Sequence, residues 1–154
     1  MAHTEIVIAA PPERVFEVLA DGRRYGHWVV GSREIRDVEP DWPAEGARLH
    51  HSIGLGPLTI RDDTRVVRSE PPWRLTLRAR ARPLGTALVD IELRPDGAGT
   101  RVVLVEDGGD PLTSMLFFHP LTQLVTRLRN DRSLMRLKEL AEGRGPSPER
   151  ARRP

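Results

Sequence analysis

The sequence contains no cysteine among its 154 residues, and it has one tyrosine and one lysine, Lys138. Without cysteine, disulfides, thiolate metal sites and cysteine nucleophiles are excluded, and we expect a cytoplasmic protein. No apolar run approaches the ~18–20 residues that a membrane span requires. The N-terminus, MAHTEIVIAAPPE, lacks the basic segment and long apolar core of a secretory signal, so we expect no stable membrane insertion.

Metal-binding and phosphate-binding motifs are also lacking. His50 and His51 are adjacent, so on a regular strand they point to opposite faces and cannot chelate one ion. The spacings H-x-x-x-H and H-E-x-x-H do not occur. Gly54 and Gly56 fall in a predicted hairpin rather than before a helix, where a phosphate loop would lie. The sequence therefore predicts neither a metal site nor a cofactor.

The net positive charge of the chain comes from its last twelve residues. The sequence pI is about 9.9, but the last twelve residues, GRGPSPERARRP, carry a net charge of +3, which leaves −1 for residues 1–142. We expect a single domain over 1–142 and a disordered Arg- and Pro-rich tail over 143–154. Because the body has no basic stripe with interleaved aromatics, we expect no nucleic-acid binding.

Patterning predicts a first strand, two short helices, a run of strands and a long helix. The first strand spans 3–9 and a helix follows Pro12, with an apolar face that ends at Asp21 and Gly22. A short second helix spans 23–28. Six further strands are predicted at 33–38, 46–54, 57–68, 73–82, 86–95 and 100–107. Apolar residues at helical spacing predict a long helix over 111–142, where Pro120 should kink or divide it.

Turn residues and apolar phases predict how the strands pair. We expect a four-residue loop at 54–57, a turn at 69–72 and a two-residue hairpin at Asp96–Gly99. The predicted pairs on the apolar face are Leu49–Asp62, His51–Ile60, Val66–Leu75, Leu77–Ile91, Leu93–Val102, Ile91–Leu104 and Val89–Glu106. The charged face would hold the pairs Arg48–Asp63 and Arg78–Asp90. One apolar and one charged face are typical of an antiparallel sheet that is covered on one side.

The long C-terminal helix is the only large apolar element that can cover this sheet. The predicted fold is therefore α+β, with a curved antiparallel sheet of six to seven strands around that helix. Such a sheet is much wider than a helix of ~10 Å diameter, so space remains between them. An apolar pocket is the expected consequence, and such pockets usually bind small molecules.

Three segments carry a resemblance to a known family: IVIAAPPERVFEVLADGRRYGHW at 6–28, DGAGTRVVLVEDG at 96–108 and RNDRSLMRLKELAE at 129–142. The chain resembles the helix-grip fold of the START-related (SRPBCC) superfamily, and within it the bacterial polyketide cyclase/dehydrase and lipid-transport-like members. This resemblance implies a hydrophobic ligand cavity but no particular activity. The chain differs from the aromatase/cyclases in being poor in tyrosine, and in lacking an obvious cluster of polar catalytic side chains.

Three ionisable side chains fall on the covered face in the predicted register: His51, Asp62 and Glu106, with Thr64 beside them. In the enzyme hypothesis His51 acts as general base with Glu106 or Asp62. Alternative interpretations stay open for each residue. A one-residue slip would exchange His50 and His51, Glu106 could lie at the cavity rim or cap the next segment, and Asp62 with Asp63 could form a solvated bulge.

We expect the remaining site residues to be apolar. The predicted ligand-binding residues are Leu49, Ile53, Leu58, Ile60, Thr64, Leu75, Leu77, Val89, Ile91, Leu104, Leu124 and Leu128. Trp28, Trp42, Phe117 and Phe118 are the predicted portal residues, with Trp28 packing in the core and Trp42 at the surface or portal. The Met115–Phe118 cluster should cover a cavity mouth, or else contact a membrane or partner.

Three functions remain open. The first is binding of a hydrophobic, lipid- or polyketide-like small molecule. The second is a cofactor-independent enzyme of the cyclase/dehydratase kind, that is, a lyase or isomerase. The third is a structural or interaction protein whose side chains fill its own cavity. We expect a monomer or weak homodimer.

Overall fold

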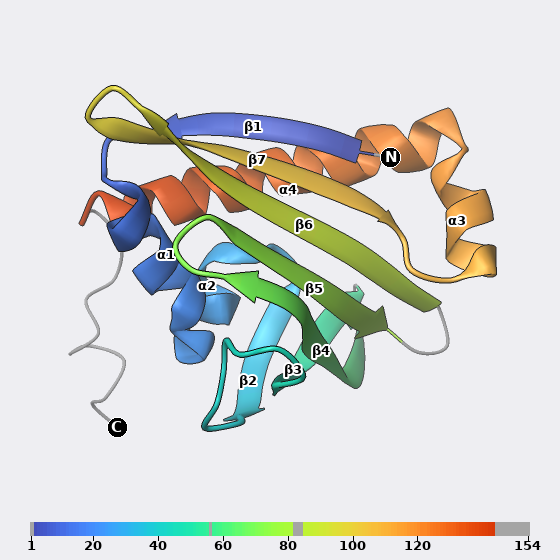
Figure 1. The fold of residues 1–154 in the computed structure, drawn as a ribbon. Helices are drawn as coiled ribbons and strands as arrows, with labels where there is room; N and C mark the ends of the chain where they lie inside the picture. The colour runs from blue at the N-terminus through green and yellow to red at the C-terminus, as the bar shows by residue number, and fades with distance from the viewer. Residues whose placement is uncertain (1, 56, 82–84, 144–154) are drawn as a thin grey trace.

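The computed structural model describes residues 2–55, 57–81 and 85–143, which form one curved antiparallel sheet with helices against it (Figure 1). The seven strands are β1 (Ala2–Ile8), β2 (Ser32–Val38), β3 (Arg48–Leu55), β4 (Leu58–Glu70), β5 (Arg74–Ala81), β6 (Gly85–Asp96) and β7 (Gly99–Gly108). Their order in the sheet is β1-β7-β6-β5-β4-β3-β2. The predicted helix-grip fold, a curved sheet around a long C-terminal helix, is confirmed.

Prolines begin each of the longer helices, as their fixed backbone angle favours. The helices are α1 (Pro12–Ala20), a 3-10 turn η1 (Gly22–Arg24), α2 (Tyr25–Trp28), α3 (Pro111–Phe117) and α4 (Pro120–Ala141). Pro120 divides the predicted 111–142 segment into α3 and α4, because proline lacks the N–H that would continue the first helix. In Figure 1, α4 runs along the sheet near β1 and β7, and α3 stands crosswise beyond its N-terminal end.

The hairpin between β6 and β7 has the predicted register. Asp96 pairs with Gly99 around a two-residue turn, and Gly97 adopts the positive φ of 60° that such a turn requires. The predicted pairs Leu93–Val102, Ile91–Leu104 and Val89–Glu106 are all present. The Asp-Gly signal was therefore sufficient to place Glu106 opposite Val89.

The predicted registers of the β3–β4, β4–β5 and β5–β6 pairs are each wrong by two residues. Leu49 pairs with Thr64 and His51 with Asp62, since β3 and β4 stay paired up to Leu55–Leu58. The strand β4 continues to Glu70 and contains a bulge between Val66 and Arg68, so the turn follows later than predicted. The observed pairs across the next two junctions are Val66–Leu77, Leu75–Ile91 and Leu77–Val89. A shift of two residues keeps every side chain on its face, so the apolar pattern cannot distinguish the two registers.

The shift changes the partners on the charged face. Arg48 lies opposite Arg65, and Arg65 lies opposite Arg78, so the predicted pairs Arg48–Asp63 and Arg78–Asp90 are wrong. Asp90 instead accepts two hydrogen bonds from Arg74, at 2.9 and 2.7 Å.

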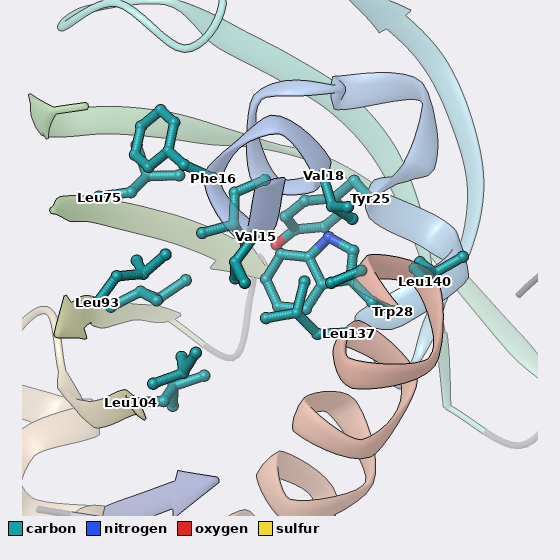
Figure 2. Packing of buried hydrophobic residues seen from close by; sticks show 14 of the residues in the cluster. Val15, Phe16, Val18, Tyr25, Trp28, Leu75, Leu93, Leu104, Leu137 and Leu140 are labelled. Carbon is teal, nitrogen blue, oxygen red and sulfur yellow. The ribbon is translucent and has the colours of Figure 1, made fainter. Parts of the chain in front are cut away.

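The apolar core lies at one end of the helix-covered face, between α1, α2, the C-terminal half of α4 and the sheet. Figure 2 shows Tyr25 and Trp28 of α2 beside Leu137 and Leu140 of α4, with Val15 of α1 nearby. The Tyr25 and Trp28 rings meet edge to face, with centroids 5.6 Å apart. Leu75, Leu93 and Leu104 complete this core from the sheet. Burial of these side chains holds α4 against the sheet.

The two halves of α4 present different kinds of side chain to the interior. In the C-terminal half the buried side chains form the apolar stripe of an amphipathic helix: Leu134, Leu137, Leu140 and Ala141. In the N-terminal half the buried side chains are Thr126 and Asn130, followed by Ser133 at the midpoint. Leu121, Leu124, Val125 and Leu128 point to solvent. The N-terminal half of α4 therefore turns polar groups toward the sheet and apolar groups outward.

Within the described residues, no helix combines the length and the apolar composition needed to cross a membrane. Apart from Gly143, the predicted disordered tail over 143–154 lies outside the described residues.

Candidate functional site: a cavity between the sheet and α4

A cavity of about 100 Å³ lies where α2, the sheet and the middle of α4 meet. Its apolar wall comes from Trp28, Val29, Val30, Ile53, Leu77, Ala79, Val89 and Leu104. Its polar groups come from Tyr25, Ser32, His51, Glu106, Arg129, Asn130 and Ser133, and Gly31 completes the lining. The cavity exists because the N-terminal half of α4 places short polar side chains, rather than leucines, against the sheet.

The first polar group centres on His51, which is 2% exposed. Thr64 Oγ1 lies 2.8 Å from His51 Nε2 and 3.4 Å from the Tyr25 hydroxyl, so this buried threonine connects the two rings. The Tyr25 and His51 rings also stack, with centroids 5.7 Å apart and planes 24° apart. These contacts hold the imidazole in one orientation at the cavity wall.

Burial sets the protonation state of both rings. Removal from water lowers the pKa of His51 below its ordinary 6.5, and this outweighs the nearby Asp62 and Asp63, which raise it. The imidazole is therefore neutral at pH 7. Burial likewise raises the pKa of Tyr25 above 10, so its hydroxyl stays protonated.

The second polar group centres on Glu106, which is 4% exposed. Its carboxylate accepts hydrogen bonds from the Arg129 guanidinium and, at 3.0 Å, from Asn130 Nδ2. The Arg129 side chain is 43% exposed and lines the cavity. Arg129 thus separates Glu106 from solvent while satisfying its charge.

Two buried polar atoms of lining residues have no hydrogen-bond partner among the described residues: Ser32 Oγ and His51 Nδ1. The Asp63 backbone raises the pKa of His51, but it forms no hydrogen bond with Nδ1. Such unsatisfied groups are uncommon in folded proteins because each one costs free energy. Both atoms belong to residues that line the cavity.

The structure brings several predicted site residues together. His51, Glu106, Ile53, Leu77, Val89 and Leu104 all line the cavity. Thr64 is fully buried behind His51. Asp62 is buried on the same face of the sheet but does not line the cavity. The sequence alternative that exchanged His50 and His51 does not hold, because His51 is the buried member of the pair.

Other predicted lining residues lie elsewhere. Leu49, Leu75 and Ile91 are fully buried in the apolar core rather than at the cavity. Ile60 is half-buried and does not line the cavity. Leu58, Leu124 and Leu128 are more than half exposed. The last two were misplaced because helical spacing predicts a stripe but does not tell which side of the helix faces the sheet.

The portal prediction also needs correction. Trp28 packs in the core as predicted and lines the cavity. Trp42 is buried, not at the surface, and its Nε1 donates a hydrogen bond to the Leu19 carbonyl at 3.4 Å. Phe118 is 81% exposed and does not line the cavity. The side chain of Phe117 lies outside the described residues.

The sequence analysis missed Arg129, Asn130 and Ser133. A signal for them exists: Thr126, Asn130 and Ser133 follow one another at helical spacing, in line with the buried Leu137. This polar stripe continues the apolar one, so the same helix face covers the cavity first and the core afterwards.

Among the described residues, no three histidine or carboxylate side chains lie close enough to hold a metal ion. The cavity instead combines an apolar wall with a neutral imidazole and a paired carboxylate. This arrangement suits an uncharged or weakly polar organic molecule.

Known structures share this architecture. TTHA0849 from Thermus thermophilus has a TM-score of 0.67 and 21% identity, over 92% of this chain and 96% of that one. CV1439 from Chromobacterium violaceum has a TM-score of 0.68 and 20% identity, over 90% and 94%. CalU16 from Micromonospora echinospora has a TM-score of 0.63 and 21% identity, over 97% and 78%. At these identities the likeness concerns the fold.

No curated protein matches the chain. Residues 2–142, which include every helix and strand described above, match the family described as polyketide cyclase/dehydrase and lipid transport. The chain therefore belongs to the polyketide cyclase/dehydrase and lipid transport family.

Proposed function

We propose that the protein binds a mostly apolar, lipid- or polyketide-like small molecule in the cavity between the sheet and α4. The observation that carries this proposal is an apolar wall interrupted by Ser32 and His51, whose Oγ and Nδ1 atoms lack hydrogen-bond partners among the described residues. Apolar burial would supply affinity at about 25 cal/mol per Å². The polar atoms would orient one carbonyl or hydroxyl of the ligand.

The size of the cavity limits what it encloses. About 100 Å³ holds the equivalent of several water molecules, enough for a short chain or one small ring. A longer ligand would extend past Arg129, whose exposed side chain forms part of the wall. Displacing Arg129 from Glu106 would be the step that admits such a ligand.

An enzyme of the cyclase/dehydratase kind is the second candidate, and a specific observation favours it. His51 and Glu106 line the same cavity, and burial keeps His51 neutral, which is the state a general base needs. In this proposal His51 takes a proton from the substrate and Glu106, held by Asn130, orients the substrate. Asp62, which does not line the cavity, would act only by stabilising the imidazolium through its charge.

Native mass spectrometry of freshly purified protein, together with calorimetric titration of p-cresol, a single apolar ring with one hydroxyl, tests the binding proposal. We expect a co-purifying molecule or saturable p-cresol binding. Ala79→Leu, which fills the cavity, should weaken p-cresol binding about tenfold, whereas Arg78→Leu, at an exposed position on the opposite face of β5, should not. Equal binding by both variants would contradict the proposal.

The enzyme candidate is tested with the same co-purifying molecule. His51→Gln should abolish its turnover and leave its binding within about twofold, because glutamine retains hydrogen-bonding groups but is no base. Turnover that survives this substitution would leave only the binding function. We also propose that the protein acts in the bacterial cytoplasm, as a monomer or weak homodimer.

A further inference from the structure

Large apolar side chains are concentrated on the outside of α3 and the N-terminal half of α4. Of the thirteen large hydrophobic side chains exposed among the described residues, eight lie between positions 112 and 128. Phe118 is 81% exposed and Met115 is 72% exposed. We call this surface the α3–α4 apolar face; it consists of Leu112, Met115, Leu116, Phe118, Leu121, Leu124, Val125 and Leu128. Exposed apolar surface of this extent usually marks an interaction site.

Helical spacing groups these side chains on one side of each helix. Leu112, Met115 and Leu116 are three and four residues apart on α3, and Leu121, Leu124, Val125 and Leu128 repeat that spacing on α4. Phe118 stands at the junction of the two helices. Figure 1 shows α3 crosswise to the N-terminal end of α4, and the eight side chains named above are all more than half exposed.

The charge of the same segment is opposite to that of the rest of the domain. Residues 111–141 carry a net charge of +3, whereas residues 1–110 carry −3. Arg127, Arg129 and Arg132 are exposed beside the apolar face, with Arg132 one helical turn after Leu128. The surface therefore combines apolar side chains with a basic border.

We propose that the α3–α4 apolar face docks on the surface of an anionic lipid membrane. Apolar side chains bordered by arginine are suited to the interface between acyl chains and phosphate headgroups. Charge disfavours a second copy of this chain as the partner, because an interface between two such faces would bring two net-positive segments together. The docking is peripheral, since no described helix can span the membrane.

The face also leads to the cavity. Val125 and Leu128 line a shallow groove of about 270 Å³ with Val30, Arg129 and Arg132. Arg129 belongs to the lining of both this groove and the cavity. A docked molecule would therefore place the Arg129 side of the cavity close to the lipid, where an apolar ligand could enter. This route rests on the proposed function, but docking itself does not.

Vesicle co-sedimentation of the full chain tests the proposal. We expect the protein to sediment with vesicles of equimolar phosphatidylcholine and phosphatidylglycerol and to remain in solution with phosphatidylcholine alone. Binding should weaken as salt is added, because the arginine contribution is electrostatic. Failure to bind the anionic vesicles at low salt would overturn the proposal, whatever the cavity binds.

Variants locate the binding surface. Phe118→Asp combined with Leu121→Asp should lower the vesicle partition coefficient about tenfold or more. Leu58→Asp is the matched control, because Leu58 is similarly exposed but lies in the β3–β4 hairpin. Arg127→Glu with Arg132→Glu should remove the preference for anionic vesicles. The basic residues of 144–154 are unchanged in all variants, so undiminished binding by the Phe118/Leu121 variant would assign binding to the tail and overturn the proposal.

Three further measurements accompany the vesicle assay. Circular dichroism verifies that each variant is folded, and a variant that is not is replaced by Phe118→Ser with Leu121→Ser. Sedimentation velocity reports self-association. A wild-type dimer that the Phe118/Leu121 substitutions convert to a monomer, without vesicle binding by either form, would show that the face is a self-interface and overturn the proposal. Binding of p-cresol in the absence of vesicles should be the same for wild type and variants, which keeps failure of docking distinct from failure of ligand binding.

Discussion

Asn130 donates a hydrogen bond of 3.0 Å from Nδ2 to Glu106 Oε2, and the preceding residue, Arg129, binds the same carboxylate. Two consecutive residues of α4 thus hold one buried carboxylate of β7. Because Glu106 is 4% exposed, its carboxylate oxygens form hydrogen bonds with these partners rather than with bulk water. The contact joins the polar half of α4 to the sheet at the cavity.

Removing Arg129 should therefore destabilise the fold. Arg129→Met leaves Glu106 buried without a counter-charge, and we expect the free energy of unfolding to fall by about 1–3 kcal/mol, less than for a fully buried pair because Arg129 is partly exposed. Adding Glu106→Gln should restore most of that loss. Urea unfolding measures both, with Arg127→Met as the exposed control within about 0.5 kcal/mol of wild type. A loss that Glu106→Gln does not relieve would argue against the pairing.

His51 should make stability depend on pH below its ordinary pKa. Burial lowers the folded-state pKa of His51 beneath the unfolded value of 6.5, so between these two values the unfolded chain binds the extra proton. The contribution of neutral His51 to the free energy of unfolding is then fully present above pH 6.5. It is lost as the pH falls from 6.5 through the lower pKa of the folded state. In His51→Gln, the urea midpoint should depend less on pH across this range than it does in the wild type. The control, His50→Gln on the opposite face of β3, should retain the wild-type slope; a slope unchanged in His51→Gln would contradict this assignment.

The orientation of α4 can be tested with one pair of leucines. Leu137 is fully buried and Leu128 is 57% exposed. Leu137→Ala should cost about 2–5 kcal/mol through lost burial and a new cavity, whereas Leu128→Ala should change stability by less than about 0.5 kcal/mol. Thermal or urea unfolding distinguishes them. Similar losses in both variants would mean that the N-terminal half of α4 is turned inward.

The Asp110 carboxylate links α3 to the sheet through hydrogen bonds, and we expect these bonds to persist down to strongly acidic pH. Its carboxylate accepts hydrogen bonds from the backbone N–H groups of Thr113 and Thr86, which lower its pKa from 3.8 to about 2. A lowered pKa stabilises the fold above the unfolded value and loses this contribution as pH falls through 2.

Asp110→Asn should lower the melting temperature at pH 7. The difference in melting temperature between wild type and variant should then decrease as the pH falls below 4. Circular dichroism melts across that range measure the effect. Asp41→Asn, an exposed carboxylate in the loop after β2, serves as control. A wild-type-to-variant difference that stays constant down to pH 2 would refute the role of the charge.

Hairpin chemistry explains which strand pairs were predictable. Asp96-Gly97 specifies a two-residue turn, so Leu93–Val102 and Glu106–Val89 followed directly from the sequence. No such signal lies between β4 and β5, where a bulge near Val67 and a longer β4 moved the register by two. Because both registers leave the same face buried, apolar alternation could place His51 inside but could not identify Asp62 as its cross-strand partner.

The candidate site divides in the same way. His51 and Glu106 were predicted because a two-residue period assigns each strand side chain to a face. Arg129 and Asn130 were missed because their helix carries two apolar stripes, one ending near Leu128 and the other beginning at Leu134. Local spacing cannot tell which of two stripes meets the sheet, since that depends on how the whole helix docks.

The amino-acid sequence alone determined the element order, the division of the last helical segment at Pro120 and the inward face of each strand from 46 to 107, because proline geometry and side-chain alternation act locally. The tertiary structure decided the rotation of α4, and with it the cavity and the exposed α3–α4 apolar face. Packing of Leu134, Leu137 and Leu140 into the core sets that rotation, so contacts at the end of the helix determine what its beginning presents to the cavity and to solvent.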